Sequence, residues 1–337
     1  MRTILVTGGA GFIGAHTVVE LVNAGYRPVI IDDFSNSEPA VIERLEKLLK
    51  RPVVHYEQDF QDIDKLKAVA EKEGVDGIIH FAAYKAVGES IKQPLRYYAN
   101  NVSGLINLLD FCETSKLQHF VFSSSCTVYG EPDQVPVTED SPVKPAVSPY
   151  GASKQMGETI LRDATRVSQN LNATALRYFN PIGSHPSALI GELPKGVPAN
   201  LVPFITQTAA GLRDKLVVYG DDYPTSDGSC IRDYIHVVDL ARAHVKALEY
   251  LEKQPAAFYD VVNIGTGKGS SVLEVIKIFE SVTGQKLPYE IGPRRVGDIV
   301  STYAAVDKAR QALGWKAEKT LADALADAWR WQQSLGR

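Results

Sequence analysis

Short apolar runs rich in β-branched residues alternate with longer amphipathic stretches through the first half of the chain. The runs occupy residues 4–8, 28–33, 52–59, 76–83, 120–125 and 174–180, and a segment of helical length separates each run from the next. Residues 41–50 and 64–74 place apolar side chains three and four apart with charges between them, and the second segment ends at a glycine. This alternation predicts an α/β fold built on a doubly wound parallel sheet.

The pattern changes after residue 180. Residues 181–203 and 219–237 are rich in proline and glycine, and loops of this kind commonly carry ligand contacts over a rigid sheet. Helical and strand-like patterns resume at 237–253, 261–267 and 271–284. We therefore expect a first domain over residues 1–180, with a return segment near 233–263, and a smaller, interleaved α/β domain over residues 181–337.

Charge and composition exclude several classes of protein. The 337 residues carry 36 basic and 40 acidic side chains without a long block of either sign, so we expect no nucleic-acid partner. No apolar run approaches the ~18 residues that span a bilayer, and the amino terminus turns glycine-rich too early for a secretory leader. We therefore expect no membrane association and a cytoplasmic location. The three cysteines and seven histidines are scattered without paired ligand spacing, so we expect neither a disulfide framework nor a metal site.

A glycine-rich turn follows the first strand-like run. The sequence TGGAGFIG places Gly8, Gly11 and Gly14 between that run and an amphipathic stretch. Bare backbone there permits a tight turn and a close approach to a pyrophosphate, while the following helix offers free N–H donors to phosphate oxygens. Asp32 and Asp33 end the second run, about the ~20 residues downstream at which a carboxylate binds the adenine ribose. Because a carboxylate there repels a 2′-phosphate, the pattern predicts a Rossmann-type domain that binds NAD rather than NADP.

A second glycine cluster, Gly265, Gly267 and Gly269, also lies between strand-like and helix-like segments. In a phosphate-binding P-loop a Gly-Lys pair is followed directly by Ser or Thr, whereas here Lys268 is followed by Gly269. We therefore interpret this second cluster as a structural turn.

A candidate catalytic group comes from the middle of the chain. Tyr150 and Lys154 are four residues apart at the start of a helical stretch, so both side chains project from one helix face. An ordinary tyrosine, with a pKa near ~10, is a poor base at neutral pH. We expect Lys154 and the positive charge of oxidised nicotinamide to lower the pKa of Tyr150. The run 120–125 ends in three serines at the carboxyl end of a predicted parallel strand, where a hydroxyl can share the substrate proton with Tyr150.

These motifs are similar to those of the extended short-chain dehydrogenase/reductase family, through TGGAGFIG, SSSCTVYG and the Tyr150-x-x-x-Lys154 pair. Further strings narrow the resemblance to the UDP-glucose 4-epimerases, also called UDP-galactose 4-epimerases, along essentially the whole chain: FAAYKAVGES, YYANNVSG, LRYFNPIGSHPS, VPANLVPFI, GDDYPTSDGSCIRDYIHVVDLA and PRRVGD. The resemblance implies an isomerase of galactose metabolism that interconverts UDP-galactose and UDP-glucose with tightly bound NAD. It also implies a homodimer.

The resemblance further implies the residues of the site. The catalytic residues that it implies are Tyr150, Ser125 and Lys154. The implied NAD contacts are Gly8, Gly11, Phe12, Ile13, Gly14, Asp32, Asp33, Asn36, Ser37, Asp59, Phe60, Phe81, Ala82, Ala83, Lys85, Asn100, Ser125, Tyr150, Lys154 and Phe179. The implied UDP-sugar contacts are Lys85, Ser125, Tyr150, Tyr178, Asn180, Asn200, Leu201, Val218, Tyr219, Arg232, Arg295, Asp298 and Thr302. Independent chemistry supports Arg232 and Arg295, because paired guanidinium groups suit a pyrophosphate.

The mechanism expected from these residues begins with Tyr150 as phenolate. It removes the proton from the sugar 4-hydroxyl while hydride leaves C4 for the nicotinamide, and Ser125 steadies that proton. The 4-keto sugar, held mainly by its nucleotide, turns over in the pocket and takes the hydride back on the opposite face. Lys85 and Lys154 are expected to position the cofactor and to tune its charge.

Two other functions compete with this hypothesis. A sugar-nucleotide 4,6-dehydratase on the same scaffold also oxidises C4 but needs an acidic pair to eliminate water, and Ser125 is followed here by Cys126 and Thr127. The second competing function is that of a non-catalytic protein that senses NAD, and the presence of all three residues Ser125, Tyr150 and Lys154 argues against it.

One departure from the family bears on specificity. Counting from Asp298, Thr302 falls where some relatives restricted to hexoses carry tyrosine, and Tyr303 is the next residue. A small residue there leaves room for an acetamido group, so we expect UDP-N-acetylhexosamines to be accepted as well. A shift of one residue in this alignment would put tyrosine back.

Overall fold

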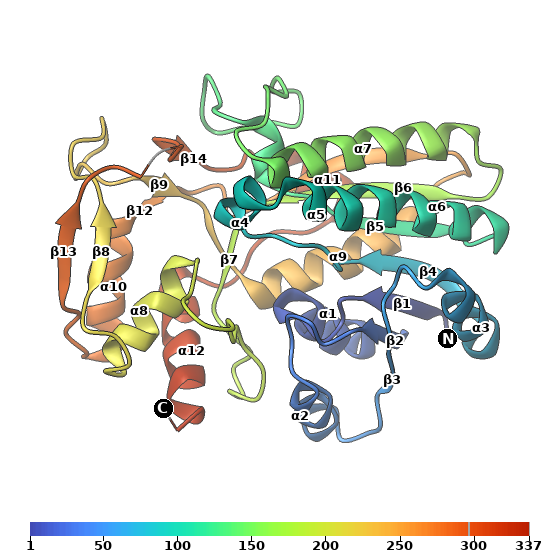
Figure 1. The fold of residues 1–337 in the computed structure, drawn as a ribbon, viewed down its shortest axis with the longest axis horizontal. Helices are drawn as coiled ribbons and strands as arrows, with labels where there is room; N and C mark the ends of the chain where they lie inside the picture. Colours follow the sequence, from blue (N-terminus) through green and yellow to red (C-terminus); the bar gives the residue numbers. More distant parts are fainter. Residues whose placement is uncertain (296, 337) are drawn as a thin grey trace.

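The computed structural model describes residues 1–295 and 297–336, and a seven-stranded parallel sheet forms its larger part (Figure 1). The strand order is β11-β6-β5-β4-β1-β2-β3. The strands span Thr3–Thr7 (β1), Arg27–Asp32 (β2), Val54–Glu57 (β3), Val75–His80 (β4), His119–Ser123 (β5), Asn172–Tyr178 (β6) and Tyr259–Ile264 (β11). From β1 the chain adds β2 and β3 on one side and then β4, β5, β6 and β11 on the other side. The direction of strand addition therefore reverses beside β1, and ligands bind at such a point in open α/β sheets. The predicted Rossmann-type fold is confirmed.

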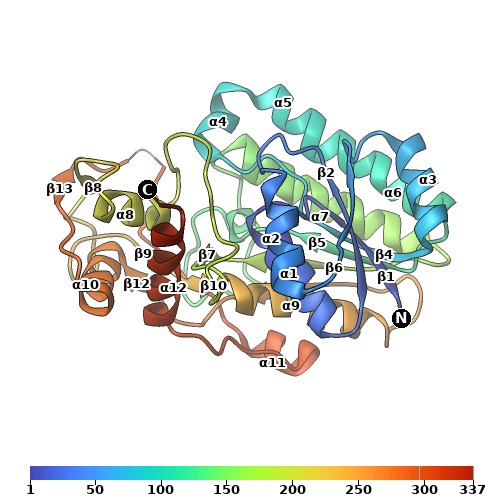
Figure 2. The same cartoon turned by 90° about the horizontal axis from the view of Figure 1, so that it is seen from below.

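Helices cover both faces of this sheet, as Figures 1 and 2 show. Along β1, Ile4 and Val6 point to one face and Leu5 to the other, so each face has its own apolar core. The first core receives α1 (Phe12–Asn23), α2 (Ala40–Leu49), α9 (Val237–Leu251) and α11 (Asp307–Leu313). The second receives α3 (Ile63–Glu73), α6 (Gly104–Thr114) and α7 (Pro149–Val167).

Short helical segments connect these layers near the carboxyl ends of the strands. They are α4 (Val87–Lys92), α5 (Pro94–Tyr98), the π-helix η1 (Ala99–Ser103) and the 3-10 helix η2 (Cys126–Tyr129). Helix α3 ends at Gly74, whose φ of 64° lies in the left-handed region, as the sequence pattern predicts.

The remaining elements gather at one side of the large sheet around a third apolar core. Three small sheets pair β7 (Asn180–Ile182) with β10 (Tyr234–His236), β8 (Leu216–Tyr219) with β13 (Tyr289–Gly292), and β9 (Ile231–Arg232) with β12 (Ser270–Ser271) and β14 (Ser301–Thr302). The helices here are α8 (Leu201–Ala209), α10 (Val272–Thr283) and α12 (Leu321–Ser334). The chain returns to the large sheet through α9 and β11 before it completes this group.

The second glycine cluster forms a turn around a buried carboxylate. Asp233 accepts hydrogen bonds from Thr266 N at 2.9 Å, Thr266 Oγ1 at 2.7 Å and Gly267 N at 3.2 Å. A Cβ on Gly265 would lie 2.5 Å from an Asp233 oxygen, so the glycine makes room for this contact. Because Asp233 already occupies these backbone donors, the turn has a structural role.

Within residues 1–295 and 297–336, no helix is long and apolar enough to cross a membrane. The same residues contain no cluster of three or more His, Cys, Asp or Glu side chains suited to a metal ion. Cys112, Cys126 and Cys230 are free thiols.

Candidate active site

The glycine turn packs tightly between β1 and α1. A Cβ on Gly14 would lie 2.2 Å from the Gly8 carbonyl oxygen, and Gly8 itself has φ of +70°. Helix α1 begins at Phe12, and its N-cap Gly11 provides no side-chain hydrogen bond to the first-turn N–H groups. Those donors remain available to a ligand at the turn, as a pyrophosphate requires. The residues present therefore fit a dinucleotide.

The carboxylate that ends β2, Asp32, lies beside this turn. Asp32 is buried, and it accepts hydrogen bonds from Ala10 N at 2.9 Å, Phe34 N at 3.0 Å and Ser37 Oγ at 2.8 Å. Burial raises the pKa of Asp32, and these hydrogen bonds oppose the rise. Asp33 is exposed and accepts from Ser35 N at 3.0 Å. Asp32 thus joins the glycine turn to the loop that carries Asn36 and Ser37.

Other predicted NAD residues line the same edge of the sheet. Phe81 N and Ala82 N both donate to the Thr7 carbonyl, at 2.9 and 3.1 Å, so the chain after β4 crosses the end of β1. Phe60 is buried with its ring 5.1 Å from that of His80. Asp59 accepts from Gln61 N, Gln61 Nε2 donates to Asn100 Oδ1, and Phe179 N donates to the Ile264 carbonyl.

The start of α7 places the predicted catalytic pair. Ser148 is the N-cap, with Oγ accepting from Gly151 N at 3.2 Å, and Pro149 occupies the first turn, where its missing N–H costs nothing. Tyr150 follows in that turn, and Lys154 lies one turn further along the same face. Both side chains are buried.

The serines at the end of β5 meet these side chains. The Ser125 hydroxyl lies next to the Tyr150 phenol and favours its ionised form. Lys154 Nζ donates to the Ser123 carbonyl at 2.7 Å, and Ser123 Oγ donates to Tyr178 Oη at 2.9 Å. The structure therefore brings together a phenol, an ammonium group and a hydroxyl at the carboxyl edge of the sheet.

The electrostatics of this group differ from the sequence-based expectation for the tyrosine. Burial raises the pKa of Tyr150, and the Ser125 hydroxyl opposes that rise only in part. Burial also lowers the pKa of Lys154 to about 8, and its ammonium contacts a carbonyl oxygen rather than the phenol. Lys154 alone therefore does not make Tyr150 acidic, because desolvation disfavours the phenolate more strongly.

Two arginines from the second half of the chain share one carboxylate. Arg295 Nη2 lies 2.6 Å and Arg232 Nη2 lies 3.7 Å from Asp298 Oδ1. The Tyr219 ring centre is 5.7 Å from the Arg295 guanidinium carbon, whereas Val218, the preceding residue of β8, is buried. The structure thus groups Arg232, Arg295, Asp298 and Tyr219 on elements that lie far apart in the sequence.

Glu192 lies between predicted substrate and cofactor residues, and the sequence motifs do not reveal it. Its Oε1 accepts from Asn200 Nδ2 at 2.6 Å and from Lys85 Nζ at 3.3 Å, so one carboxylate joins a predicted substrate residue to a predicted cofactor residue. Asn200 is the N-cap of α8, and Leu201 is its first residue. No local motif marks Glu192, because its partners lie 8 and 107 positions away along the chain.

The position of Thr302 follows from strand register. Thr302 on β14 pairs with Arg232 on the parallel strand β9, so their side chains share a face of this small sheet. Tyr303 points to the other face, where a Cβ on Gly269 would lie 3.0 Å from its ring. Thr302 therefore faces the same side as Arg232, and Tyr303 does not.

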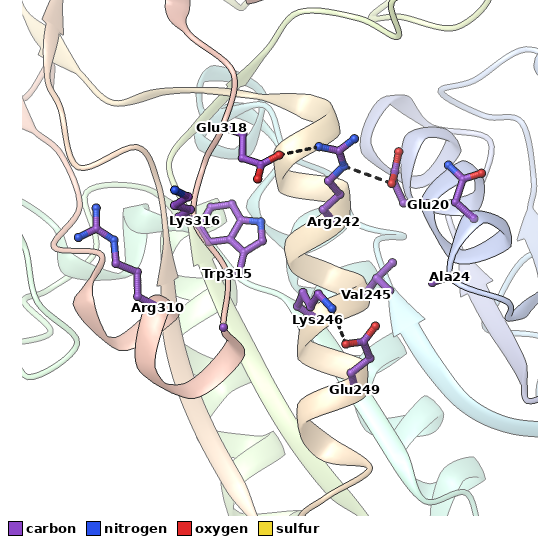
Figure 3. Close-up of a pocket in the computed structure, with 12 residues that line it drawn as sticks. Glu20, Ala24, Arg242, Val245, Lys246, Glu249, Arg310, Trp315, Lys316 and Glu318 are labelled. Atoms are coloured by element: carbon purple, nitrogen blue, oxygen red, sulfur yellow. Dashed lines mark hydrogen bonds and ion pairs between the residues drawn. The ribbon is translucent and has the colours of Figure 1, made fainter.

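A surface cleft of about 530 Å³ lies elsewhere, between α1, α9 and α11 (Figure 3). Arg242 on α9 reaches across it to Glu20 and Glu318, each at 3.3 Å, and Lys246 pairs with Glu249 at 2.7 Å. Its lining contains none of the predicted site residues, and these charges pair with one another. The candidate site is therefore the carboxyl edge of the sheet, not this cleft.

Comparison with known proteins identifies the family. A family model described as GDP-mannose 4,6 dehydratase matches residues 5–328. The UDP-glucose 4-epimerase of Bacillus subtilis is 48% identical over 331 residues, which cover 98% of this chain and 97% of that protein. The chain belongs to the UDP-glucose 4-epimerase family. The family model is named for a dehydratase, whereas relatives that match over the whole length are epimerases.

Solved structures of UDP-glucose 4-epimerases have the same fold. The enzyme from Stenotrophomonas maltophila, with bound NAD and formylated UDP-arabinopyranose, matches with a TM-score of 0.97 and 46% identity, covering 100% of this chain and 99% of that one. The enzyme from Bifidobacterium longum, in complex with NAD+ and UDP, matches with a TM-score of 0.94 and 46% identity, covering 99% and 98%. The predicted membership of the UDP-glucose 4-epimerase family is confirmed.

Proposed function

We propose that this chain is an isomerase that interconverts UDP-galactose and UDP-glucose by inverting C4 of the sugar, with NAD as a retained cofactor. The observation that carries the proposal is the cluster of Tyr150, Ser125 and Lys154 at the same edge of the sheet as the glycine turn, after which α1 begins without a side-chain N-cap. Its relatives over the whole chain are UDP-glucose 4-epimerases, and one of the solved relatives holds NAD together with a UDP-sugar.

The glycine turn and the first turn of α1 would hold the pyrophosphate of NAD, and Asp32 would bind the adenine ribose. When bound, NAD accepts a hydride from C4 of the sugar and returns it, and its positive charge favours the phenolate of Tyr150. We assign residues 1–180, with a return segment near 233–263, to NAD and residues 181–337 to the UDP-sugar.

Tyr150 acts as the base in the first half of the reaction. Its phenolate oxygen takes the proton of the 4-hydroxyl as the hydride leaves C4, and the Ser125 hydroxyl shares that proton. The product is a 4-keto sugar. In the second half Tyr150 returns the proton to the oxygen when the hydride re-enters C4 from the opposite face, so no net oxidation occurs.

The diphosphate and uridine provide the binding energy, away from the reacting carbon. Arg232 and Arg295 face the diphosphate in this proposal, with Asp298 fixing both guanidinium groups. A sugar that makes few strong contacts of its own is free to rotate as the 4-keto intermediate, which is what inversion requires.

The direct test mixes the purified protein with UDP-galactose and no added cofactor. We expect UDP-glucose to form, with NAD released only on denaturation. A protein that carries NAD yet turns over neither UDP-hexose would instead support an NAD-sensing role.

We also propose that the enzyme acts in the cytoplasm in galactose metabolism. Its small net charge of −4 and its free thiols are consistent with that compartment, where UDP-hexoses are dissolved metabolites.

We further propose that the protein is a homodimer formed through α4, α5, α6 and α7, which lie side by side in Figure 1. Large apolar side chains are exposed on these helices: Ile91 at 61%, Leu95 at 81%, Ile106 at 47% and Met156 at 44%. A group of exposed apolar residues on adjacent helices is typical of a surface that a second copy covers.

Substitution Leu95→Asp should convert the dimer into a monomer, because it places a charge among apolar side chains. Sedimentation velocity measures the change as a halving of mass. Leu212→Asp alters a side chain that is 50% exposed in the turn after α8, and it should leave the mass unchanged. A dimer that survives Leu95→Asp would contradict this interface.

We also propose that the enzyme accepts UDP-N-acetylhexosamines. The Thr302 side chain shares a face of its small sheet with Arg232. In this proposal that small side chain borders the sugar and leaves room for an acetamido group. We expect turnover of UDP-N-acetylgalactosamine as well as UDP-galactose. Thr302→Tyr should reduce the rate on the acetamido sugar at least about tenfold, by filling the space with a ring, and change the hexose rate little. An undetectable rate on the acetamido sugar by the parent protein would contradict the assignment.

A further inference from the structure

A buried ion pair lies next to the Tyr150–Lys154 pair. Arg177 on β6 and Glu158 on α7 have side chains only 7% and 9% exposed. Arg177 Nε lies 2.9 Å from Glu158 Oε1, and Nη2 lies 2.6 Å from Oε2, so the contact is bidentate. A buried ion pair is weak support for stability, since both charges must be desolvated. The reaction proposed above uses neither side chain, so their placement needs another reason.

The reason lies in the register of α7 against the end of β5. Tyr150, Lys154 and Glu158 are spaced four apart on one helix face, and each contacts one residue of the serine run 123–125. Tyr150 lies next to the Ser125 hydroxyl, and Lys154 donates to the Ser123 carbonyl. The middle contact is Ser124 Oγ, which donates to Glu158 Oε1 at 2.6 Å. Three successive serines at and after the end of β5 thus lie against three successive turns of the helix.

Arg177 in turn fixes Glu158. Its guanidinium lies over the Tyr129 ring at 4.8 Å, and Tyr129 Oη donates to Asn263 Oδ1 at 2.6 Å. With Arg177 held by this packing, both carboxylate oxygens of Glu158 have defined partners, and the direction of the carboxylate is set.

We propose that Glu158 is a positioning residue for the C4 chemistry: it fixes the helix that carries Tyr150 and Lys154 against the serine run 123–125 and places a negative charge beside Lys154. The proposal rests on the function proposed above, because it assigns Glu158 to that same reaction.

The charges around Lys154 support this role. Burial lowers the pKa of Lys154 to about 8, and the negative charge of Glu158 opposes that fall. Tyr150, Tyr178 on β6 and His80 on β4 also surround this group. Burial lowers the pKa of His80 to about 3 and raises the pKa of Tyr178 to about 12, so both side chains are neutral near pH 7. Arg177 adds a positive charge behind Glu158, which its bidentate contact neutralises. Among the groups named here, Glu158 is therefore the one that favours the protonated form of Lys154.

The sign of the pH effect follows. Without the negative charge of Glu158, the pKa of Lys154 falls further, and the ammonium group loses its proton at a lower pH. In Glu158→Gln holoenzyme, the alkaline limb of the kcat profile for UDP-galactose should move to lower pH by roughly one unit. The matched control is Glu73→Gln, which removes a carboxylate bound to Arg27 and Tyr56 far from the site and should leave the profile in place.

The proposal would be overturned if active Glu158→Gln protein showed an unshifted pH profile of kcat, with only a pH-independent decrease in kcat that parallels its loss of stability. If that variant does not fold, Ser124→Ala decides, because it removes one hydrogen bond and keeps every charge. We expect kcat to fall about tenfold, with the KM for UDP-galactose and the NAD content within twofold of the parent. An unchanged kcat would overturn the positioning role. The parent protein is measured in the same assay, and its failure to form UDP-glucose would reject the proposed function itself.

Discussion

Tyr150→Phe should lower kcat for UDP-galactose by about a thousandfold, because it removes the oxygen that acts as the base for the sugar 4-hydroxyl. Such a loss corresponds to about 4 kcal/mol of transition-state stabilisation. The ring stays in place, so the fold, the NAD content and the KM should change little. The measurement is kcat by coupled detection of UDP-glucose, together with NAD content after denaturation.

The matched control for this substitution is Tyr26→Phe. Tyr26 is also buried, and its hydroxyl donates to Glu252 at 2.9 Å at the opposite end of the sheet. It should keep the parent kcat. A Tyr150→Phe protein that turns over UDP-galactose as fast as the parent would show that another group is the base.

Gly14→Ala should abolish NAD retention and destabilise the protein. The added Cβ would lie 2.2 Å from the Gly8 carbonyl oxygen and 2.8 Å from Gly9 Cα, and backbone atoms cannot move aside as a flexible side chain can. We expect the free energy of unfolding to fall by about 3 kcal/mol or more. Chemical denaturation measures the loss, and absorbance of the released cofactor measures the NAD content.

Gly88→Ala provides the control for a glycine-to-alanine change within a helix. A Cβ added to Gly88 would have no neighbouring atom of its own chain within 4 Å. Because α4 belongs to the proposed dimer surface, the control is measured in the Leu95→Asp background, where the substitution should be neutral or stabilising by about 0.5–1 kcal/mol. Normal NAD retention in Gly14→Ala protein would contradict the assignment of this turn to the pyrophosphate.

The features that can be predicted from the sequence are those that depend only on residues close together in a short segment of the chain. The strand runs, the glycine turn and the helix stop at Gly74 each depend on neighbouring residues, and the structure has all of them. The Tyr150–Lys154 pair can be predicted for the same reason, because a helix brings residues four apart to one face.

The features that the sequence could not predict depend on contacts between distant segments. Glu192 lies 107 positions from Lys85, and Arg177 meets Glu158 only because β6 and α7 pack together. The orientation of Thr302 depends on its register with Arg232, which no local pattern specifies. The burial that raises the pKa of Tyr150 likewise comes from the complete fold.

The central claim is that bound NAD accepts one hydride from C4 of the sugar and returns it to the same carbon within a single active site. The most direct measurement uses UDP-galactose deuterated at C4, with the purified protein and no added cofactor. We expect UDP-glucose that keeps the deuterium at C4, with no net NADH at the end of the reaction. Deuterium lost to solvent, or turnover that requires added NAD in proportion to product, would contradict the claim.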